Sequence, residues 1–202
     1  MAAAKNSPKT SHLSTPDLVL LSLLAEKPMH GYQANAELER RQIRDWAAIS
    51  RPQVYYSMEK LARAGLIRRC ETADPSEGPE RQVFCTTKRG IDALADSLER
   101  GDWVTARERP PFLTWMALSW KARPGVLARQ IQRRQEFLER ELARERATLE
   151  AVRVEVGHDF HEAVWMITLM IEQFETEMRW LERLKQQAEK RGAARHPRLV
   201  SH

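Results

Sequence analysis

The sequence lacks several features that would place it in a large class of proteins. Glycine is scarce, with 8 residues in 202, and this scarcity argues against a large barrel or a loop-rich fold. No apolar run approaches the roughly 20 residues that a membrane span requires. The apolar segment 18–24 is too short for a signal peptide, and no small-residue cleavage site follows it. We therefore expect a cytoplasmic protein with no membrane partner.

Motifs of catalysis are also missing. The sequence contains no Walker motif, dinucleotide fingerprint, serine elbow or metalloprotease signature. His158 and His161 lie three residues apart, with Glu162 beside them, but two imidazoles are too few for a metal site and no cysteine is near them in the sequence. Histidines at a helix start without a metal role are the favoured interpretation. We predict no metal, no cofactor and no enzymatic activity.

What the chain does contain is a sufficient apolar fraction for a core and an uneven distribution of charge. It is 42% hydrophobic and 30% charged, with a formal net charge of +5. The segment 40–69 is strongly basic, and its only acidic residues are Asp45 and Glu59. Such a segment attracts phosphates, although a solvated surface has the same composition.

The N-terminal half predicts a series of helices with recognisable starts and ends. Thr15, Pro16 and Asp17 provide a capping hydroxyl, a first-turn proline and an acid for a helix that ends at Pro28. A second helix begins near His30 and Gly31, and a short turn covers residues 44–49. A third helix begins at Ser50, where Gln53 completes a capping-box spacing, and it continues to about Ala64 before Gly65.

Two short strands and a fourth helix should follow. Residues 66–70 and 81–86 flank a segment rich in turn formers and predict a hairpin with a long polar tip. Thr87 caps a helix that carries Ile91, Leu94 and Leu98 at helical spacing. Cys70 and Cys85 fall on the two strands; opposite each other they would be able to form a disulfide, whereas a reducing cytoplasm favours two thiols.

The C-terminal part predicts helices only. A short helix over 112–121 and a long helix over 125–156 are separated by Pro124 and Gly125, and a last helix follows Gly157. Steps of four and three form a heptad seam on the last helix, which we assign to dimerisation: Phe160, Val164, Ile167, Ile171, Phe174, Met178 and Leu181. The alternative for this seam is an antiparallel contact with the 125–156 helix of the same chain, and both contacts can hold because the last helix is also apolar at Trp165, Leu169 and Met170.

These elements predict a mainly α protein, with an N-terminal winged helix-turn-helix, a two-stranded wing and a C-terminal helical dimerisation domain. We place a flexible tail at 1–13, the DNA-binding domain at 14–102, a linker at 103–110, the dimerisation domain at 111–191 and a second flexible tail at 192–202. The third helix offers an apolar side, with Val54, Met58 and Leu61, and a polar side that suits the major groove. The candidate DNA-binding residues are Tyr32, Ser50, Arg51, Gln53, Tyr55, Tyr56, Lys60 and Arg81.

Three segments of this plan resemble the PadR family of transcriptional regulators, in particular its subgroup with a long C-terminal domain. They are Leu23 to Tyr32 with its Pro-Met-His-Gly-Tyr run, Ile49 to Tyr55, and Leu61 to Ile67; the Phe84 to Gly90 run and Trp180 to Leu184 add to them. The chain departs from many members at Pro52-Gln53 and at Val83. The resemblance implies a homodimer through the C-terminal helices and repression that is relieved in some members by aromatic molecules.

The sequence thus favours a repressor that binds a pseudo-palindromic operator as a homodimer and that a small aromatic ligand releases. The alternative is a winged-helix interaction module without sequence-specific DNA binding. Aromatic residues and a methionine near the domain junction are the candidates for a ligand pocket, against the simpler interpretation that they are core: Trp103, Trp115, Met116, Trp120 and Trp165.

Overall fold

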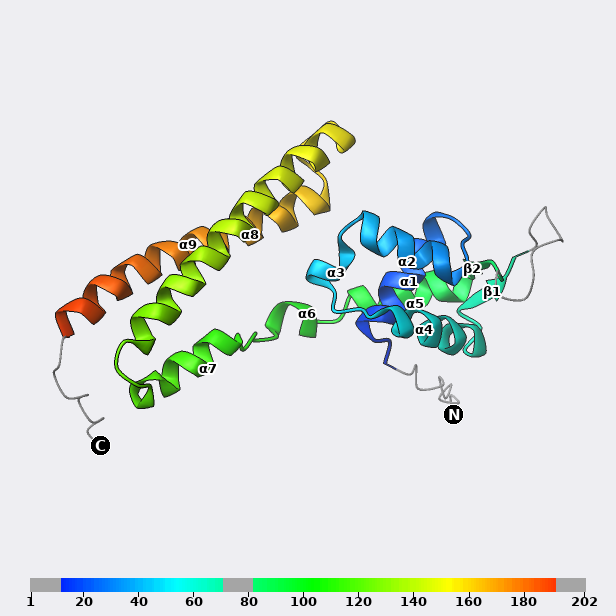
Figure 1. Ribbon diagram of the computed structural model, residues 1–202. Helices are drawn as coiled ribbons and strands as arrows, with labels where there is room; N and C mark the ends of the chain where they lie inside the picture. The colour runs from blue at the N-terminus through cyan, green and yellow to red at the C-terminus, as the bar shows by residue number, and fades with distance from the viewer. Residues whose placement is uncertain (1–11, 71–81, 192–202) are drawn as a thin grey trace, which may run out of the picture. The chain divides into compact units, whose positions relative to one another are not determined.

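The computed structural model describes residues 12–70 and 82–191, and the chain divides into two units, residues 1–107 and 108–202 (Figure 1). The first unit contains α1 (Thr15–Glu26), α2 (Gly31–Arg40), α3 (Ile43–Trp46), α4 (Arg51–Arg63), β1 (Ile67–Arg69), β2 (Phe84–Thr86), α5 (Lys88–Leu98) and α6 (Asp102–Thr105). The second contains α7 (Pro111–Leu118), the 3-10 helix η2 (Ser119–Lys121), α8 (Val126–Val156) and α9 (Glu162–Arg191).

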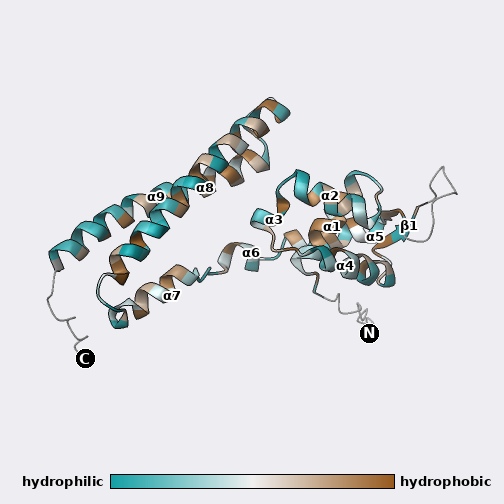
Figure 2. Cartoon of the chain, in the orientation of Figure 1, coloured by the Kyte–Doolittle hydropathy of each residue, from teal (hydrophilic) through white to brown (hydrophobic). Residues whose placement is uncertain are grey.

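Helix α1 forms the centre of the first unit. Leu20, Leu21 and Leu24 are almost completely buried, and Figure 2 colours much of this helix as hydrophobic. The cap lies one residue before the predicted Thr15, because Asp17 Oδ2 accepts hydrogen bonds from Ser14 N at 2.8 Å and from Ser14 Oγ at 2.7 Å. A helix that is apolar around most of its circumference must be surrounded, and the other elements of the unit pack around it.

The connection between α2 and α4 is more regular than predicted. A short helix, α3, replaces the first half of the expected turn over 44–49, and it begins after Gln42, whose φ of 51° is left-handed. Helix α4 confirms the predicted start at Ser50 and ends before Gly65. Gly65 has a φ of +68°, which side chains with a Cβ rarely adopt, so this residue allows the chain to turn directly into β1.

The wing is an antiparallel pair of strands, and each strand is shorter than predicted. Ile67 pairs with Thr86, Arg68 with Cys85 and Arg69 with Phe84. The hairpin is fixed to the rest of the unit by an isolated bridge between Met29 and Phe84, whose backbone groups exchange hydrogen bonds of 3.0 and 3.1 Å. The predicted tip of the hairpin, including Arg81, lies outside the described residues.

Helix α5 has the predicted cap but a different buried face. Thr87 accepts a hydrogen bond from Gly90 N at 3.1 Å, as a cap should. However, Ile91 is 52% exposed and Leu98 is 62% exposed, while Gly90, Ala93 and Ser97 are buried and Leu94 is partly buried. The physical reason is close packing, since a Cβ at Gly90 would lie 2.1 Å from the Leu66 carbonyl oxygen. The small residues, not the large apolar ones, therefore mark the inward face.

The second unit is built on the antiparallel pair of α8 and α9, which lie side by side in Figure 1. Gly125 and Gly157, with φ of 76° and 73°, precede and follow α8. Two clusters fill the seam: Ile131, Leu138 and Leu181 form one, and Leu142, Ile167 and Ile171 form the other. Phe174 and Met178 pack against both clusters.

The predicted dimerisation seam is therefore used within the chain. Val164, Ile167, Ile171 and Leu181 are buried in the single chain, so the contact with α8 accounts for their apolar spacing, and a dimer contact through them stays a prediction. Phe160 is 79% exposed and precedes α9, so it is not part of the seam. Heptad spacing shows that a helix has a partner stripe but does not specify which helix provides the partner, and α8 provides it here.

The boundary between the two units lies within the predicted linker. Helix α6 occupies part of the segment 103–110 that was predicted as a linker, and the division between the units falls after Arg107. Among the described residues, no helix combines the length and the apolar character that crossing a membrane would require.

Candidate nucleic-acid interface

The start of α4 is fixed by its own side chains. The Oε1 atom of Gln53 accepts a hydrogen bond from Ser50 N at 2.7 Å, which completes the predicted capping box. Val54, Met58 and Leu61 face the core as predicted, and Ser57 is buried with them. Because one side of the helix is fixed in the core, the opposite side is available to a ligand.

That opposite side carries the predicted polar and aromatic residues. The Arg51 side chain is 74% exposed, Tyr56 is 69% exposed and Tyr55 is 49% exposed. Gln53 is also exposed, although its amide oxygen belongs to the cap and its amide nitrogen is the group that the cap does not use. Guanidinium, amide and phenol groups on one exposed helix face are suited to base edges and phosphates.

The start of α2 lies against this face through a close contact. A Cβ built at Gly31 would lie 2.5 Å from Cε1 of Tyr55, so the Tyr55 ring occupies the space that only glycine leaves open. Next to Gly31, Tyr32 is 75% exposed. His30 caps α2, since its Nδ1 accepts from Gln33 N at 3.1 Å. The Gly-Tyr pair therefore places an exposed tyrosine on the helix that contacts α4.

A residue that the sequence did not single out fixes the loop before α4. Arg44 donates to the carbonyl oxygen of Ile49, to Asn35 Oδ1 at 2.7 Å and to Glu39 Oε1 at 3.0 Å. Asn35 in turn donates to Gly31 O at 3.1 Å. This guanidinium therefore connects α2 with the residues that lead into α4. Its only signal in the sequence was membership of the basic segment, which gives no indication of a bracing role.

The structure gives Lys60 a role different from the predicted DNA contact. Its ammonium group binds Asp17 Oδ2 at 2.5 Å, and the Asp17 side chain is completely buried. Burial alone would raise the pKa of Asp17, but hydrogen bonds from Lys60 and Ser14 outweigh burial and lower that pKa. Since Lys60 compensates a buried carboxylate on α1, we remove it from the candidate DNA surface.

The wing contributes two exposed arginines and a cross-link. Arg68 and Arg69 on β1 are both exposed. Cys70 and Cys85 form a disulfide with a Cα–Cα distance of 6.1 Å. The two cysteines are not directly opposite, because Cys85 pairs with Arg68 and Cys70 N donates to Val83 O at 2.9 Å. They are diagonal neighbours on one face of the hairpin.

The residues predicted for a ligand pocket make separate contacts, each within its own unit. In the second unit, the Trp115 ring stacks on Phe112, which packs with Ile131 and Leu181. Trp165 instead donates to Asp159 O at 3.0 Å, beside the turn between α8 and α9. Phe112 packs near Ile131, close to the start of α8, whereas Asp159 follows the end of α8 at Val156. Trp115 and Trp165 therefore lie near opposite ends of the helix pair.

The other predicted members have individual contacts. Trp103 donates to Ser97 O at 2.7 Å in the first unit, Lys121 lies 4.3 Å from the centroid of the Trp120 ring, and Met116 is partly buried in α7. His158 and His161 lie in the turn before α9, and each accepts a backbone hydrogen bond at Nδ1. Within the described ranges, no group of three potential ligands is arranged for a metal ion.

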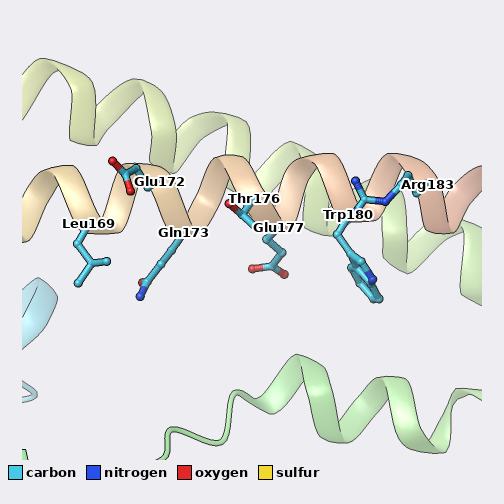
Figure 3. Close-up of a pocket in the computed structure, with 7 residues that line it drawn as sticks. All are labelled: Leu169, Glu172, Gln173, Thr176, Glu177, Trp180 and Arg183. Atoms are coloured by element: carbon cyan, nitrogen blue, oxygen red, sulfur yellow. The ribbon is translucent and has the colours of Figure 1, made fainter. Parts of the chain in front are cut away.

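A different hollow lies on α9 alone. It is an open groove of about 510 Å³, and Figure 3 shows its seven lining side chains along one length of the helix: Leu169, Glu172, Gln173, Thr176, Glu177, Trp180 and Arg183. Leu169 is 56% exposed and Trp180 is 39% exposed. This stripe lies next to the seam that α9 shares with α8, since Glu177 accepts two hydrogen bonds of 2.8 Å from Arg134 of α8.

Comparisons with known proteins support the assignment of the first unit as a winged helix-turn-helix. Residues 20–96 match the model of the transcriptional regulator PadR-like family. No curated protein sequence matches the chain. Bacillus subtilis PadR in complex with operator DNA has a TM-score of 0.73 and 17% identity over 87% of this chain and 98% of its own. The same regulator in complex with p-coumaric acid has a TM-score of 0.58 and 16% identity, over 87% of this chain and 99% of its own.

The Vibrio cholerae virulence activator AphA has a TM-score of 0.63 and 17% identity over 88% of this chain and 99% of its own. At these identities the structural likeness establishes a shared fold, and it extends over both units. The matched family segment runs from α1 to α5 and contains the whole of α4, the start of α2 and both strands of the wing. The matched segment contains the winged helix-turn-helix, so this part of the chain is similar to the transcriptional regulator PadR-like family.

Proposed function

We propose that the chain is a sequence-specific repressor that inserts α4 into the major groove of operator DNA. The observation that carries this proposal is the exposed face of α4, on which Arg51 and Tyr56 project opposite a buried Val54-Met58-Leu61 stripe. Arg51 and the Gln53 amide nitrogen are suited to base edges, and Tyr32, Tyr55 and Tyr56 to phosphates at the rim. Arg68 and Arg69 extend the positive charge onto the wing.

The test of this proposal is selection of bound duplexes from a random-sequence pool, followed by affinity measurements on variants. We expect Arg51→Ala combined with Tyr56→Ala to weaken binding by roughly 5- to 150-fold, the effect of losing one or two specific contacts. Arg133→Ala, at an exposed arginine of α8, is the control. Unchanged affinity of the double variant would contradict the assignment of α4 and favour the interaction-module alternative, as would binding that ignores sequence and disappears at modest salt.

We propose that the chain is a homodimer and that the groove stripe of α9 (Leu169, Glu172, Gln173, Thr176, Glu177, Trp180 and Arg183) is the contact. A single α4 covers one half-site, so a pseudo-palindrome requires two copies related by a two-fold axis. An antiparallel contact of two α9 helices centred on Thr176 would bring Arg183 within one helical turn of Glu172 in the second copy. Leu169 and Trp180 would provide the apolar part of this contact.

The effector part of the hypothesis rests on the resemblance, because Trp115 and Trp165 do not meet. The structure of Bacillus subtilis PadR with p-coumaric acid identifies the first compound to test. If a phenolic acid relieves repression here, p-coumaric acid added to the complex of this chain with its selected duplex should release the DNA. No release at millimolar concentration would remove this compound from the proposal and leave DNA binding unaffected.

A further inference from the structure

The wing contains both cysteines of the chain, joined by a disulfide. Each cysteine is partly buried, so neither is enclosed in the core. A cross-link between two partly buried cysteines of the hairpin is a chemical site in its own right, and neither the family match nor DNA binding explains its presence.

The position of the cross-link follows from the strand register. Arg68 pairs with Cys85, and Cys70 continues the ladder opposite Val83, so Arg68, Cys70 and Cys85 share one face of the hairpin. The other face contains Ile67, which is buried, and Phe84, which packs against the core. The disulfide therefore lies on the outer face, beside an exposed arginine, and not in the core.

The two strands that it joins lead to the two parts of the candidate interface. Strand β1 continues directly from α4 through Gly65 and Leu66. Strand β2 is hydrogen-bonded through Phe84 to Met29, which lies two residues before Gly31 at the start of α2. Each strand has three residues in the described part of the hairpin, and the covalent link adds to the ladder hydrogen bonds that join them.

We propose that Cys70 and Cys85 form a reversible dithiol–disulfide site through which thiol reductants and disulfide oxidants control DNA affinity. This inference rests on the proposed function. The disulfide form holds β1 and Arg68 in one arrangement relative to α2 and binds DNA more tightly. The dithiol form loses that restraint and must order the hairpin on binding, which lowers affinity.

The exchange with glutathione balances in two steps. A glutathione thiolate attacks one cysteine sulfur, the protein S–S bond breaks, and the released cysteine thiolate takes up a proton. A second glutathione thiolate then attacks the mixed disulfide and releases the other cysteine as a thiol. In total, one protein disulfide and two glutathione molecules give one protein dithiol and one glutathione disulfide, with two electrons and two protons transferred to the protein.

The experiment uses the full chain in both redox forms. A duplex is selected from a random pool with the protein kept reduced by glutathione, so that the selection does not favour the disulfide. Alkylation and mass measurement count the thiols after treatment with reduced glutathione or with glutathione disulfide, and the affinity of each form for that duplex is measured. The Cys70→Ser/Cys85→Ser variant receives the same two treatments.

We expect two thiols in the reduced form, none in the oxidised form, and affinity about fivefold or more higher for the oxidised form. The double serine variant should bind like the reduced protein under both treatments. Two free thiols after treatment with glutathione disulfide, or equal affinities of the two forms, would overturn the inference while leaving the proposed function intact. Absence of binding by either form would overturn both. The wild-type comparison remains decisive if the serine variant fails to fold.

Discussion

At the scale of single residues, the pair of Asp17 and Lys60 shows how a charge can be mistaken for part of a binding surface. Lys60 lies on a basic segment and on a helix that faces DNA in the proposal, yet its ammonium group binds a carboxylate 43 residues earlier. Ser14 and Lys60 both donate to the Oδ2 atom of this buried carboxylate. A sequence pattern cannot reveal this pair, because the two residues meet only after α1 and α4 pack.

We expect Lys60→Met to destabilise the first unit by about 2–3 kcal/mol, since it leaves a buried carboxylate without its cation. The value is below that for a fully buried pair because the Lys60 side chain is 34% exposed and solvent screens it. Chemical denaturation followed by circular dichroism measures the change. Asp17→Asn added to Lys60→Met removes the uncompensated charge and should recover most of the loss. A single variant as stable as the wild type would contradict this account.

Glu37 predicts how stability depends on pH. It accepts from Lys27, Arg40 and Arg41, and hydrogen bonds led by that from Arg40 lower its pKa from 4.5 to about 2 despite an opposing effect of burial. A carboxylate with a lowered pKa stabilises the folded state above its unfolded pKa and loses that contribution as pH falls. We therefore expect stability to fall between pH 4.5 and pH 2.

Glu37→Gln is the matched variant for this pH dependence. It should be less stable than the wild type at pH 7, and the difference between the two proteins should shrink as the pH approaches 2, because only the wild type loses this charge. Asp17 has a lowered pKa in both proteins, so its acid dependence cancels in the comparison. Denaturation curves at intervals of half a pH unit are sufficient, and two parallel stability profiles would contradict the role of Glu37.

At the scale of elements, the contact between α2 and α4 depends on a missing side chain. We expect Gly31→Ala to displace the Tyr55 ring, because the added Cβ would lie 2.5 Å from Cε1 of that ring. The variant should lose stability and bind the selected duplex more weakly. In the Tyr55→Ala background the same substitution should cost much less stability, since the obstructing ring is gone. Additive losses across this double-mutant cycle would show that the ring is not the cause.

The elements also show what a sequence can and cannot predict. Ser50 and Gln53 predicted the start of α4 because a capping box is local, and its partners are three residues apart. The helical spacing of Ile91 and Leu98 did not identify the buried face of α5, because that face is selected by close approach to Leu66, which depends on tertiary packing. The α9 seam was correctly recognised as apolar, but periodicity could not decide between a second copy and α8.

At the scale of the whole molecule, dimerisation should determine whether two recognition helices reach one operator. With the heptad seam occupied by α8, we assign to the second copy the groove stripe of α9, whose apolar residues are Leu169 and Trp180. Leu169→Glu combined with Trp180→Glu places like charges on both sides of a two-fold contact, where they repel each other and oppose apolar burial. Both side chains are exposed in the single chain, so the fold of the protomer should persist.

We expect sedimentation equilibrium to give the mass of a dimer for the wild type and of a monomer for this double variant, with the same helical circular dichroism. Affinity for the palindromic duplex should fall roughly 100-fold or more, because the second half-site no longer benefits from being linked to the first. Binding to an isolated half-site should not change, since α4 is untouched. Val154→Glu, at a residue of α8 that is 77% exposed, is the control and should remain dimeric. A double variant that stays dimeric would assign the two-fold contact to another surface, while retained half-site binding would still support α4 as the helix that contacts DNA.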